Sequence, residues 1–439
     1  MSINLLLRTN PTDRITRADH LLDAFADHDN AATVWSIWRP VATRPTTPAA
    51  NDLLWLSIAV LAADALVLRS EAADGWTRDI GLKLKVGRPE WAAQLPGVDR
   101  MLRFLTGDEW SVRLGQGRPR VLNVPAVEAD AVCLLSGGLD SLVGAINLLG
   151  SDDTSRVLLV GVEDSSYSAG RQAKLSVALS AAFPGRVAFR QTWTRFRQPT
   201  ADQERPIPMR REQTTRSRSL LFLGSGLTAA AAIGPMVPLH VPENGLIGIN
   251  VPLVPARSGT LSTRTTHPHF LDLLRGIAIA VGVQNPIVNN LRLQTKGEAL
   301  TACARPDLLA ALAPTSVSCA HPTATRYLGP GRTGRSGCGY CYPCLIRRAS
   351  MHVAGLDDGA HYAFDVLTRP DFVNSPSTRA DSLRATLAAI RRGAAATDVL
   401  RTGPVREFAQ YANLHRRGLA EIEAWMRTAT DPDVRARLR

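Results

Sequence analysis

The stretch CLLSGGLDSLVGA, from Cys133 to Ala145, places a short turn of serine, glycine and aspartate between an apolar run and a helical pattern. The apolar residues before Ser136 predict a buried strand, and the residues from Asp140 onward predict a helix. A strand, a glycine-containing turn and a helix start at the edge of a parallel sheet form an anion site, because backbone N–H groups there point toward a bound phosphate. The stretch therefore predicts a phosphate-binding loop.

The residues of this turn supply further groups that suit a phosphate. Gly137 and Gly138 let the backbone approach an anion closely, and Ser136 and Ser141 add hydroxyl donors. Asp140 can cap the helix or hold a magnesium ion beside the phosphates. The lysine of the GxxxxGK[ST] motif is absent, which excludes a P-loop of the phosphate-transferring type. The alternative is a plain structural turn, and in either case we expect Ser136 and Asp140 to lie at the surface.

Beyond the turn, short apolar strands alternate with helices, which is the pattern of a parallel sheet with helices on both faces. The expected strands are AVCLL, RVLLVGV, RVAFRQT and PLHVP, at 131–135, 156–162, 186–192 and 238–242. The expected helices lie at 140–150, 170–183, 216–233 and 268–282. We therefore predict an α/β fold with a doubly wound parallel sheet.

The length of 439 residues exceeds that of one typical domain, and we predict three units. Residues 1–125 hold six of the eight tryptophans and combine a helix at 52–68 with strands at 78–86 and 109–114. They indicate an α+β module that either packs the tryptophans in its own core or presents them to a partner. The α/β domain follows at 126–350. Residues 351–439, with stretches such as SLRATLAAIRRGA and LAEIEAWMRTA, predict a helical C-terminal extension.

Composition and charge indicate a folded protein that works away from membranes. Hydrophobic residues make up 45% of the chain and charged residues 21%, which is ordinary globular usage. The net charge of +12 would suit a nucleic-acid partner, but the arginines are scattered, so we do not expect nucleic acid as the direct substrate. The opening residues lack an export signal, and the apolar stretch from Leu53 to Leu68 contains Asp64 and is short for a membrane span. We expect a buried helix there and a cytoplasmic protein.

Four cysteines gather in one short stretch of the chain, at 316–348. Cys319 is followed by Cys338, Cys341 and Cys344, and the last three are separated by two residues each. Four thiolates with this spacing suit a tetrahedral structural zinc. An iron–sulfur cluster is the alternative, because four cysteines serve both kinds of site.

The remaining two cysteines and a second glycine-rich stretch give little evidence of a functional site. Cys133 falls in the predicted buried strand and Cys303 lies outside the cluster, so we interpret both as core or incidental residues. The stretch GPGRTG, Gly329 to Gly334, matches GxGxxG in letters only. Neither a strand before it nor a helix after it is predicted, so we interpret it as a loop between cysteines rather than a dinucleotide site.

The turn resembles the SGGxDS signature of PP-loop ATP pyrophosphatases, which have a Rossmann-like fold of the adenine nucleotide alpha hydrolase type. These enzymes cleave ATP between the α and β phosphates, adenylate a substrate oxygen and release pyrophosphate. The resemblance implies that ATP is bound by the whole signature, which here reads Ser136, Gly137, Gly138, Leu139, Asp140 and Ser141.

Three further segments narrow the resemblance to 7-cyano-7-deazaguanine synthases, the QueC family. They are RSLLFL at 218–223, TKGE at 295–298, and the group of Cys319, Cys338, Cys341 and Cys344, which we call the cysteine knuckle. Order and spacing agree over about 131–350. The family uses ATP and Mg²⁺ to activate the carboxylate of 7-carboxy-7-deazaguanine, adds ammonia, and dehydrates the amide to a nitrile in queuosine biosynthesis. The resemblance implies a zinc-containing, ATP-dependent carbon–nitrogen ligase in which Asp140, Lys296 and Arg218 are catalytic and Lys296 and Arg218 neutralise charge on the departing phosphates.

The chain also departs from the family pattern. The family is about half this length, and the aromatic-Gly-Gln segment expected after the second strand reads EDSSYSAGRQAK here. An Arg-Asn pair expected before the LLFL helix is Arg218-Ser219. The long extensions resemble the QueC-like proteins of bacterial anti-phage Qat systems, which are thought to modify a partner protein with the activated deazapurine acid. We therefore expect a 7-deazapurine substrate, a co-encoded protein partner and a role in antiviral defence.

Three other functions stay open from the sequence. A housekeeping queuosine-pathway synthase would use ammonia as the acceptor. A nucleotide-binding scaffold without catalysis would use residues 1–125 to recruit partners. A sulfur-inserting tRNA-modifying enzyme would need a redox-active cysteine outside the metal site, and Cys303 is the one plausible spare.

Overall fold

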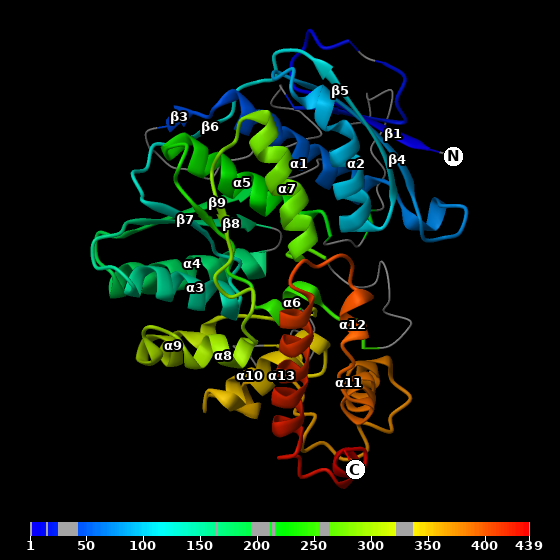
Figure 1. The fold of residues 1–439 in the computed structure, drawn as a ribbon, viewed down its shortest axis with the longest axis vertical. Helices are drawn as coiled ribbons and strands as arrows, with labels where there is room; N and C mark the ends of the chain where they lie inside the picture. Colours follow the sequence, from blue (N-terminus) through cyan, green and yellow to red (C-terminus); the bar gives the residue numbers. More distant parts are fainter. Residues whose placement is uncertain are drawn as a thin grey trace.

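The computed structural model describes residues 2–14, 16–24, 43–163, 166–194, 211–212, 216–253, 264–321 and 337–438. Within these residues the strands form a four-stranded sheet, a five-stranded sheet and a two-stranded pair. Figure 1 shows the four-stranded sheet at one end, the C-terminal helices at the other, and the five-stranded sheet between them. The GPGRTG stretch lies outside the described residues.

The five-stranded sheet is parallel throughout and has the strand order β11-β10-β7-β8-β9. Its strands are β7 (Ala131–Leu134), β8 (Val157–Glu163), β9 (Val187–Trp193), β10 (Leu239–His240) and β11 (Ile287–Val288). Helix α5 (Arg218–Ile233) packs on one face, and α3 (Leu139–Gly150) and α4 (Ser166–Ala182) pack on the other. Covering both faces explains why β7 and β8 are apolar almost without interruption. The prediction of an α/β fold with helices on both sides of a parallel sheet is confirmed.

The N-terminal residues form a second parallel sheet, so the predicted α+β class of this region is wrong. Its strands are β1 (Ile3–Arg8), β2 (His20–Asp23), β4 (Asp79–Val86) and β5 (Glu109–Gln116), in the order β2-β1-β4-β5. Helix α2 (Trp91–Thr106) connects β4 to β5 as a βαβ crossover, which makes the two strands parallel. The short strands β3 (Thr43–Pro45) and β6 (Asn123–Pro125) form an antiparallel pair.

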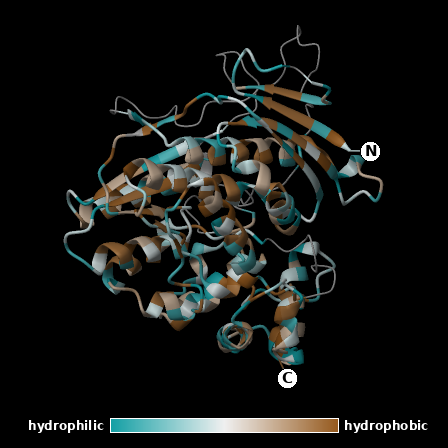
Figure 2. Cartoon of the chain, turned by 45° about the horizontal axis from the view of Figure 1, so that its top comes forward, coloured by the Kyte–Doolittle hydropathy of each residue, from teal (hydrophilic) through white to brown (hydrophobic). Residues whose placement is uncertain are grey.

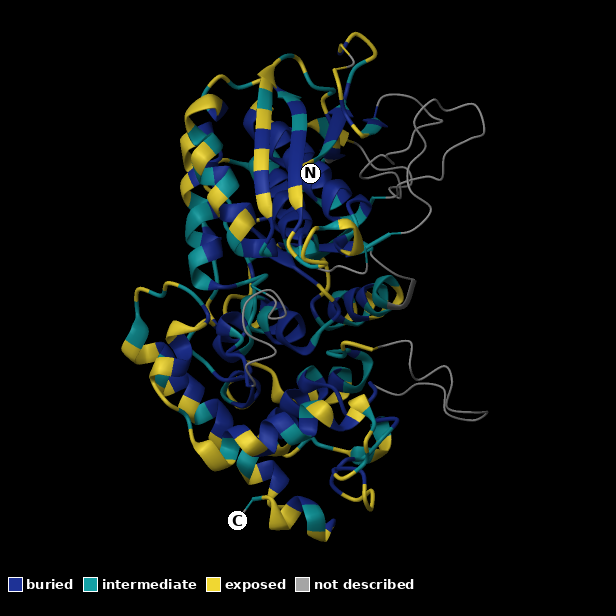
Figure 3. Ribbon diagram, turned by 90° about the vertical axis from the view of Figure 1, so that its right-hand side faces the viewer, coloured by how far each residue is buried: buried dark blue, intermediate teal, exposed yellow. Residues whose placement is uncertain are grey.

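Two layers of helices lie between the two sheets. Helix α1 (Pro48–Leu66) contacts β4 on one side and α5 on the other, and α2 packs against α7 (Pro268–Val281). Because α1 is covered on all sides, its apolar residues are spread around its circumference rather than gathered on one face. Figure 2 shows the brown of apolar residues in the helices between the two sheets. It is long and apolar enough for a membrane span, but 89% of its most apolar window is buried inside the protein. The prediction of a buried helix is confirmed, and Figure 3 shows the dark blue of buried residues behind the N-terminal strands.

One hydrophobic core runs across the boundary expected near residue 125. It joins residues from Leu5 to Ile287, including α1, α2, α5 and α7. Trp55 and Trp91 are fully buried and Trp110 is 5% exposed, so these three belong to the core, whereas Trp35 and Trp38 lie outside the described residues. The division of the chain into domains at 125 and 350 stays a prediction.

The rest of the described chain is helical and packs below the five-stranded sheet (Figure 1). A second core gathers the cysteine knuckle and the C-terminal helices. The helices of this whole part of the chain are α6 (Gly245–Ile249), α8 (Lys296–Thr301), α9 (Pro306–Leu312), α10 (Tyr342–Val353), α11 (Asp381–Arg392), α12 (Thr397–Leu400), α13 (Phe408–Met426) and α14 (Pro432–Ala436), of which α8, α9 and α12 contribute to other cores. The two helical stretches expected after residue 351 correspond to α11 and α13.

Candidate active site and metal centre

The predicted phosphate-binding loop, Ser136–Ser141, lies where the strand order of the five-stranded sheet reverses direction. From β7 the chain proceeds outward through β8 to β9, and β10 and β11 then extend the sheet on the other side of β7. The carboxyl ends of β7 and β10 therefore diverge around a crevice, which is the usual ligand site of such sheets. Ser136–Ser141 follow β7, and Pro242–Asn244 follow β10.

The backbone of the loop requires glycine. Gly137 has φ +85°, in the left-handed region that favours glycine, and Gly138 is the N-cap of α3. The Ser136 hydroxyl accepts a hydrogen bond from the Gly138 N–H at 3.3 Å, and the Ser141 hydroxyl donates to the Gly138 carbonyl at 2.9 Å. The predicted strand, turn and helix are thus present, with the helix N-terminus facing the crevice.

Neighbouring segments hold the loop in place. The Val317 N–H donates to the Gly137 carbonyl at 2.9 Å, so the chain leading into the cysteine knuckle is bonded to the loop. Gln172 of α4 is fully buried and donates to the Ser136 carbonyl at 3.4 Å and to the Val162 carbonyl at 3.1 Å. Gln172 comes from the stretch that departs from the family pattern, and here it ties α4 to the ends of β7 and β8.

Asp140 is buried and ion-paired, so the expectation that it lies at the surface is wrong. Its carboxylate is 8% exposed, and Oδ2 accepts hydrogen bonds from Lys296 Nζ at 2.8 Å and Asn244 Nδ2 at 2.9 Å. A helical aspartate in the first turn points back over the loop, where α8 and the segment after β10 meet it. The site therefore brings together Asp140 and Lys296, which are 156 residues apart in sequence.

A second carboxyl group, Glu243, lies beside Asp140. Burial opposes the ionisation of Asp140, but Lys296, Glu243 and Asn244 outweigh it, and the pKa of Asp140 lies below its ordinary value. Burial, and then the Asp140 carboxylate, raise the pKa of Glu243 well above its ordinary value. Asp140 is therefore the carboxylate that pairs with the lysine, and Glu243 is the one of the two carboxyl groups that keeps its proton to the higher pH. The sequence analysis missed Glu243, although its place directly after a strand at the crevice was a usable signal.

Lys296 begins α8 and is buried there. Its side chain is 5% exposed, and a capping box formed by Thr295 and Glu298 fixes the start of the helix. Lys296 is therefore unlike an exposed lysine at a helix start, because its ammonium is held against Asp140 inside the crevice.

Two adjoining cavities open onto the loop. The first, named the loop cavity, has a volume of about 330 Å³ and is lined by the loop, Lys296, Glu243 and Arg171. The second, named the α5 cavity, has a volume of about 270 Å³ and is lined by apolar and hydroxyl side chains that include Phe222, Ser219 and Thr266. Arg218, Ser136 and Glu243 line both cavities. The structure thus places the three predicted catalytic residues at one crevice, and their catalytic roles stay a prediction. Arg171 was missed by the sequence analysis.

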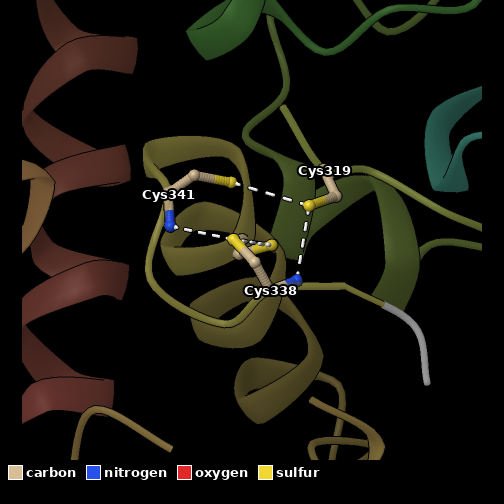
Figure 4. Close-up of side chains that lie close together, drawn as sticks. Cys319, Cys338 and Cys341 are labelled. Atoms are coloured by element: carbon tan, nitrogen blue, oxygen red, sulfur yellow. Dashed lines mark hydrogen bonds between the residues drawn. The ribbon is translucent and has the colours of Figure 1, made fainter. Parts of the chain in front are cut away.

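The four predicted cysteines come together in one site. Their sulfur atoms lie within 4.8 Å of one another. Figure 4 shows the side chains of Cys319, Cys338 and Cys341 turned toward one another. The Sγ atoms of Cys319 and Cys341 are 3.9 Å apart, as are those of Cys338 and Cys344, close to the separation of about 3.8 Å that tetrahedral zinc–sulfur bonds of about 2.3 Å require. Backbone N–H groups donate to these sulfurs. The Cys338 N–H donates to Cys319 Sγ at 3.3 Å, and the Cys341 N–H donates to Cys338 Sγ at 3.4 Å. The arrangement suits a metal such as zinc.

The knuckle turn itself depends on one glycine. Gly339 has φ +86°, and a Cβ there would lie 1.9 Å from the Phe364 carbonyl oxygen.

The other two cysteines, Cys133 and Cys303, lie apart from the site. Burial raises the pKa of Cys133 to about 12 and raises the pKa of Cys303, so neither thiol is prone to ionise.

We expect aerobically purified protein to carry one tightly held zinc per chain and Cys341→Ser to lose it. A serine hydroxyl does not replace a thiolate, so the apparent zinc affinity should fall by at least about 100-fold and the folding yield should fall with it. Elemental analysis and soluble yield are the measurements, with Cys303→Ser as the matched control. Stoichiometric iron with a visible charge-transfer band would replace the zinc assignment with an iron–sulfur cluster.

Comparison with family models, curated proteins and solved structures gives no match to this chain. The resemblance therefore rests on the motifs and on the site described above.

Proposed function

We propose that this protein is an ATP-dependent carbon–nitrogen ligase of QueC-like type that adenylates the carboxylate of a 7-deazapurine, 7-carboxy-7-deazaguanine, and releases pyrophosphate. The observation that carries the proposal is the Ser136–Ser141 loop at the crevice of a doubly wound sheet, with the Asp140–Lys296 ion pair directly beside it. A plain structural turn would not require a buried lysine at its base. The PP-loop assignment of the fold is part of this proposal.

The proposed reaction assigns a task to each side chain. The loop N–H groups and the Ser136 hydroxyl hold the β and γ phosphates in the loop cavity, and the Ser141 hydroxyl lines the adjoining α5 cavity. A carboxylate oxygen of the acid attacks the α-phosphorus, the bond to the bridging oxygen breaks, and pyrophosphate leaves with the bonding electrons. Lys296 and Arg218 line the cavity where this charge develops, and such preorganised cations favour the transition state over the ground state.

Asp140 and Glu243 are the residues that would hold Mg²⁺, because it prefers carboxylate oxygens and these two carboxyl groups share one wall of the loop cavity. A bound Mg²⁺ would supply charge neutralisation at the phosphates. The raised pKa of Glu243 would oppose this role at low pH, since ligands bind in their deprotonated form.

The α5 cavity suits the acid. Phe222 offers an aromatic face, and the hydroxyls of Ser219, Thr265 and Thr266 can bond the polar edges of a flat heterocycle. Because Arg218 lines both cavities, it would face the carboxylate and the α-phosphate together. Ser219 stands where the family has asparagine, so the contacts to the ring differ at this position.

We propose further that the acyl group passes to an amine of a partner protein encoded beside this one, as part of antiviral defence in the cytoplasm. The acceptor amine attacks the acyl carbon, AMP leaves, and the amine loses a proton. The support is the part of the chain beyond 131–350, which a reaction with free ammonia does not need. Cys303 is buried with its pKa raised, which makes it a poor thiol for the sulfur-inserting alternative.

The test incubates full-length protein with ATP and 7-carboxy-7-deazaguanine, together with either ammonia or the co-encoded protein, and analyses all products by mass. We expect AMP, pyrophosphate and an amide adduct on the protein. Free nitrile formed with ammonia, and no adduct, would establish the housekeeping synthase instead. ATP binding without pyrophosphate under any condition would establish the scaffold.

A further inference from the structure

The C-terminal helix α13 contacts the start of α8, the short helix that begins with Lys296. Glu421 of α13 accepts hydrogen bonds from the Thr295 hydroxyl and, at 3.3 Å, from the Gly297 N–H. Gly297 makes this approach possible, because a Cβ there would lie 2.6 Å from Glu421 Oε1. The Glu421 carboxylate therefore bonds the residues on both sides of Lys296.

A second side chain of α13 anchors the same turn. Arg417 Nε donates to Glu298 Oε1 at 2.6 Å, and its Nη2 donates to the Leu293 carbonyl at 2.9 Å. Glu298 in turn accepts from the Thr295 N–H at 2.9 Å, which closes the capping box. Two charged residues one turn apart on α13, Arg417 and Glu421, thus bond the first turn of α8 from outside the crevice.

This anchoring bears on Lys296 because a lysine side chain is long and flexible. The ammonium reaches Asp140 only if the backbone that carries it is held at the right distance. The side chains of Glu421 and Arg417 hold that backbone from α13, in addition to its packing on α10, and the ion pair holds the other end of the lysine side chain.

We infer that Glu421 is a positioning residue for Lys296, so that the C-terminal extension, through α13, is a working part of the ATP site rather than an appended unit. This inference deepens the proposed function and rests on it for the catalytic role of Lys296, but the placement of Lys296 can be tested without any turnover. The extension lies beyond the segment that resembles the QueC family.

The first test measures how well Lys296 is protected from an amine reagent. The chain has only four lysines, so acetylation with acetic anhydride can be followed at each of them by peptide mass spectrometry. In the unaltered full-length protein Lys296 should react slowly and the exposed Lys174 quickly. In Glu421→Ala the reaction at Lys296 should accelerate about 5- to 30-fold, the range that loss of a helix-capping contact represents. Lys174 and the two N-terminal lysines should be unchanged.

The matched control is Glu423→Ala, on the same helix, because Glu423 pairs with Arg427 on α13 itself and not with α8. Glu421→Gln is a second variant that keeps the shape of the side chain. Its amide still offers one acceptor oxygen, so protection of Lys296 should fall less than in Glu421→Ala. Unchanged protection of Lys296 in Glu421→Ala, with Thr295 and Gly297 intact, would overturn the inference whatever the activity.

The second test asks whether the positioning matters for catalysis. In Glu421→Ala the kcat for pyrophosphate release should fall about 5- to 30-fold with little change in the KM for ATP, because the contact acts through charge neutralisation in the transition state. In a Lys296→Met background the same substitution should have no further effect, whereas additive losses would contradict positioning through Lys296. If Lys296 becomes reactive in Glu421→Ala but unaltered protein releases no pyrophosphate, the inference holds and the proposed function fails.

Discussion

Replacing Asp140 by asparagine should reduce pyrophosphate release by about 10²- to 10³-fold while the protein remains folded. The loss follows from removing the ionised group that orients Lys296 and would hold the metal, and single preorganised contacts at such sites have effects of this size. The fold should survive because Glu243 can compensate. Burial, and then the Asp140 charge, raise the pKa of Glu243, so a neutral residue at 140 removes the second cause, lowers the pKa of Glu243 and favours a carboxylate there that can face the lysine.

The compensation itself can be tested. In Asp140→Asn/Glu243→Gln no carboxylate is left to pair with the buried lysine, and an uncompensated buried charge costs about 3–5 kcal/mol. The double variant should therefore show a clearly lower midpoint of thermal unfolding, whereas Asp140→Asn alone should not. Asp153→Asn, at a fully exposed aspartate, is the control for both measurements. Undiminished pyrophosphate release by Asp140→Asn would remove the proposed ATP cleavage.

Much of the site could be predicted because it is encoded in local patterns. The Ser136–Ser141 turn needs only a strand before it and a helix after it, and both are marked by uninterrupted apolar residues and a glycine pair. The cysteine spacing likewise limits where four sulfurs can meet, and the structure brings all four together. The alternation of strands and helices after residue 131 was sufficient to predict the parallel sheet.

What could not be predicted depends on contacts between distant segments. The strand before Glu243 and Asn244 was predicted, but the pairing of β10 beside β7, which brings these residues to Asp140, depends on the fold as a whole. Strand β11 was missed because it has only two residues. Helix α2 was missed because Pro96 and Gly97 interrupt the helical spacing of its apolar residues. Without α2, the βαβ crossover that makes β4 and β5 parallel could not be predicted. The burial of Asp140 could not be read from its neighbours in sequence, since Lys296 is supplied by α8.

The N-terminal residues also proved more closely joined to the site than the sequence indicated. Asp64 of α1 is fully buried, bonds Arg78 Nη2 at 2.6 Å, and accepts hydrogen bonds from the backbone N–H and hydroxyl of Ser217. Ser217 directly precedes Arg218, which lines both cavities. The buried carboxylate of α1 thus holds the start of α5, and with it the backbone of Arg218.

A chain lacking residues 1–125 should therefore fail to fold, instead of retaining pyrophosphate release as a separate module would allow. The deletion exposes the face of α5 that α1 covers, including the fully buried Leu220 and Leu227. Each such side chain contributes about 1.5–3 kcal/mol of burial, and several of them together exceed the stability of about 5–15 kcal/mol that a typical domain has. Soluble yield and thermal unfolding of 126–439 are the measurements.

Co-expression distinguishes a lost interface from a damaged chain. The fragment 126–439 lacks the N-terminal part of the shared hydrophobic core. If that is why it fails to fold, residues 1–125 produced as a second polypeptide in the same cells should restore soluble protein, and the two fragments should purify together. Asp64→Asn in the N-terminal fragment should weaken that rescue, because Arg78 then loses one buried carboxylate and Ser217 loses an ionised acceptor. A soluble fragment 126–439 with a single sharp unfolding transition would contradict this prediction. It would show that the hydrophobic residues after 125 are sufficient for that fragment to fold alone. The N-terminal sheet would then be free to recruit a partner, which is one of the two roles that the sequence left open for residues 1–125.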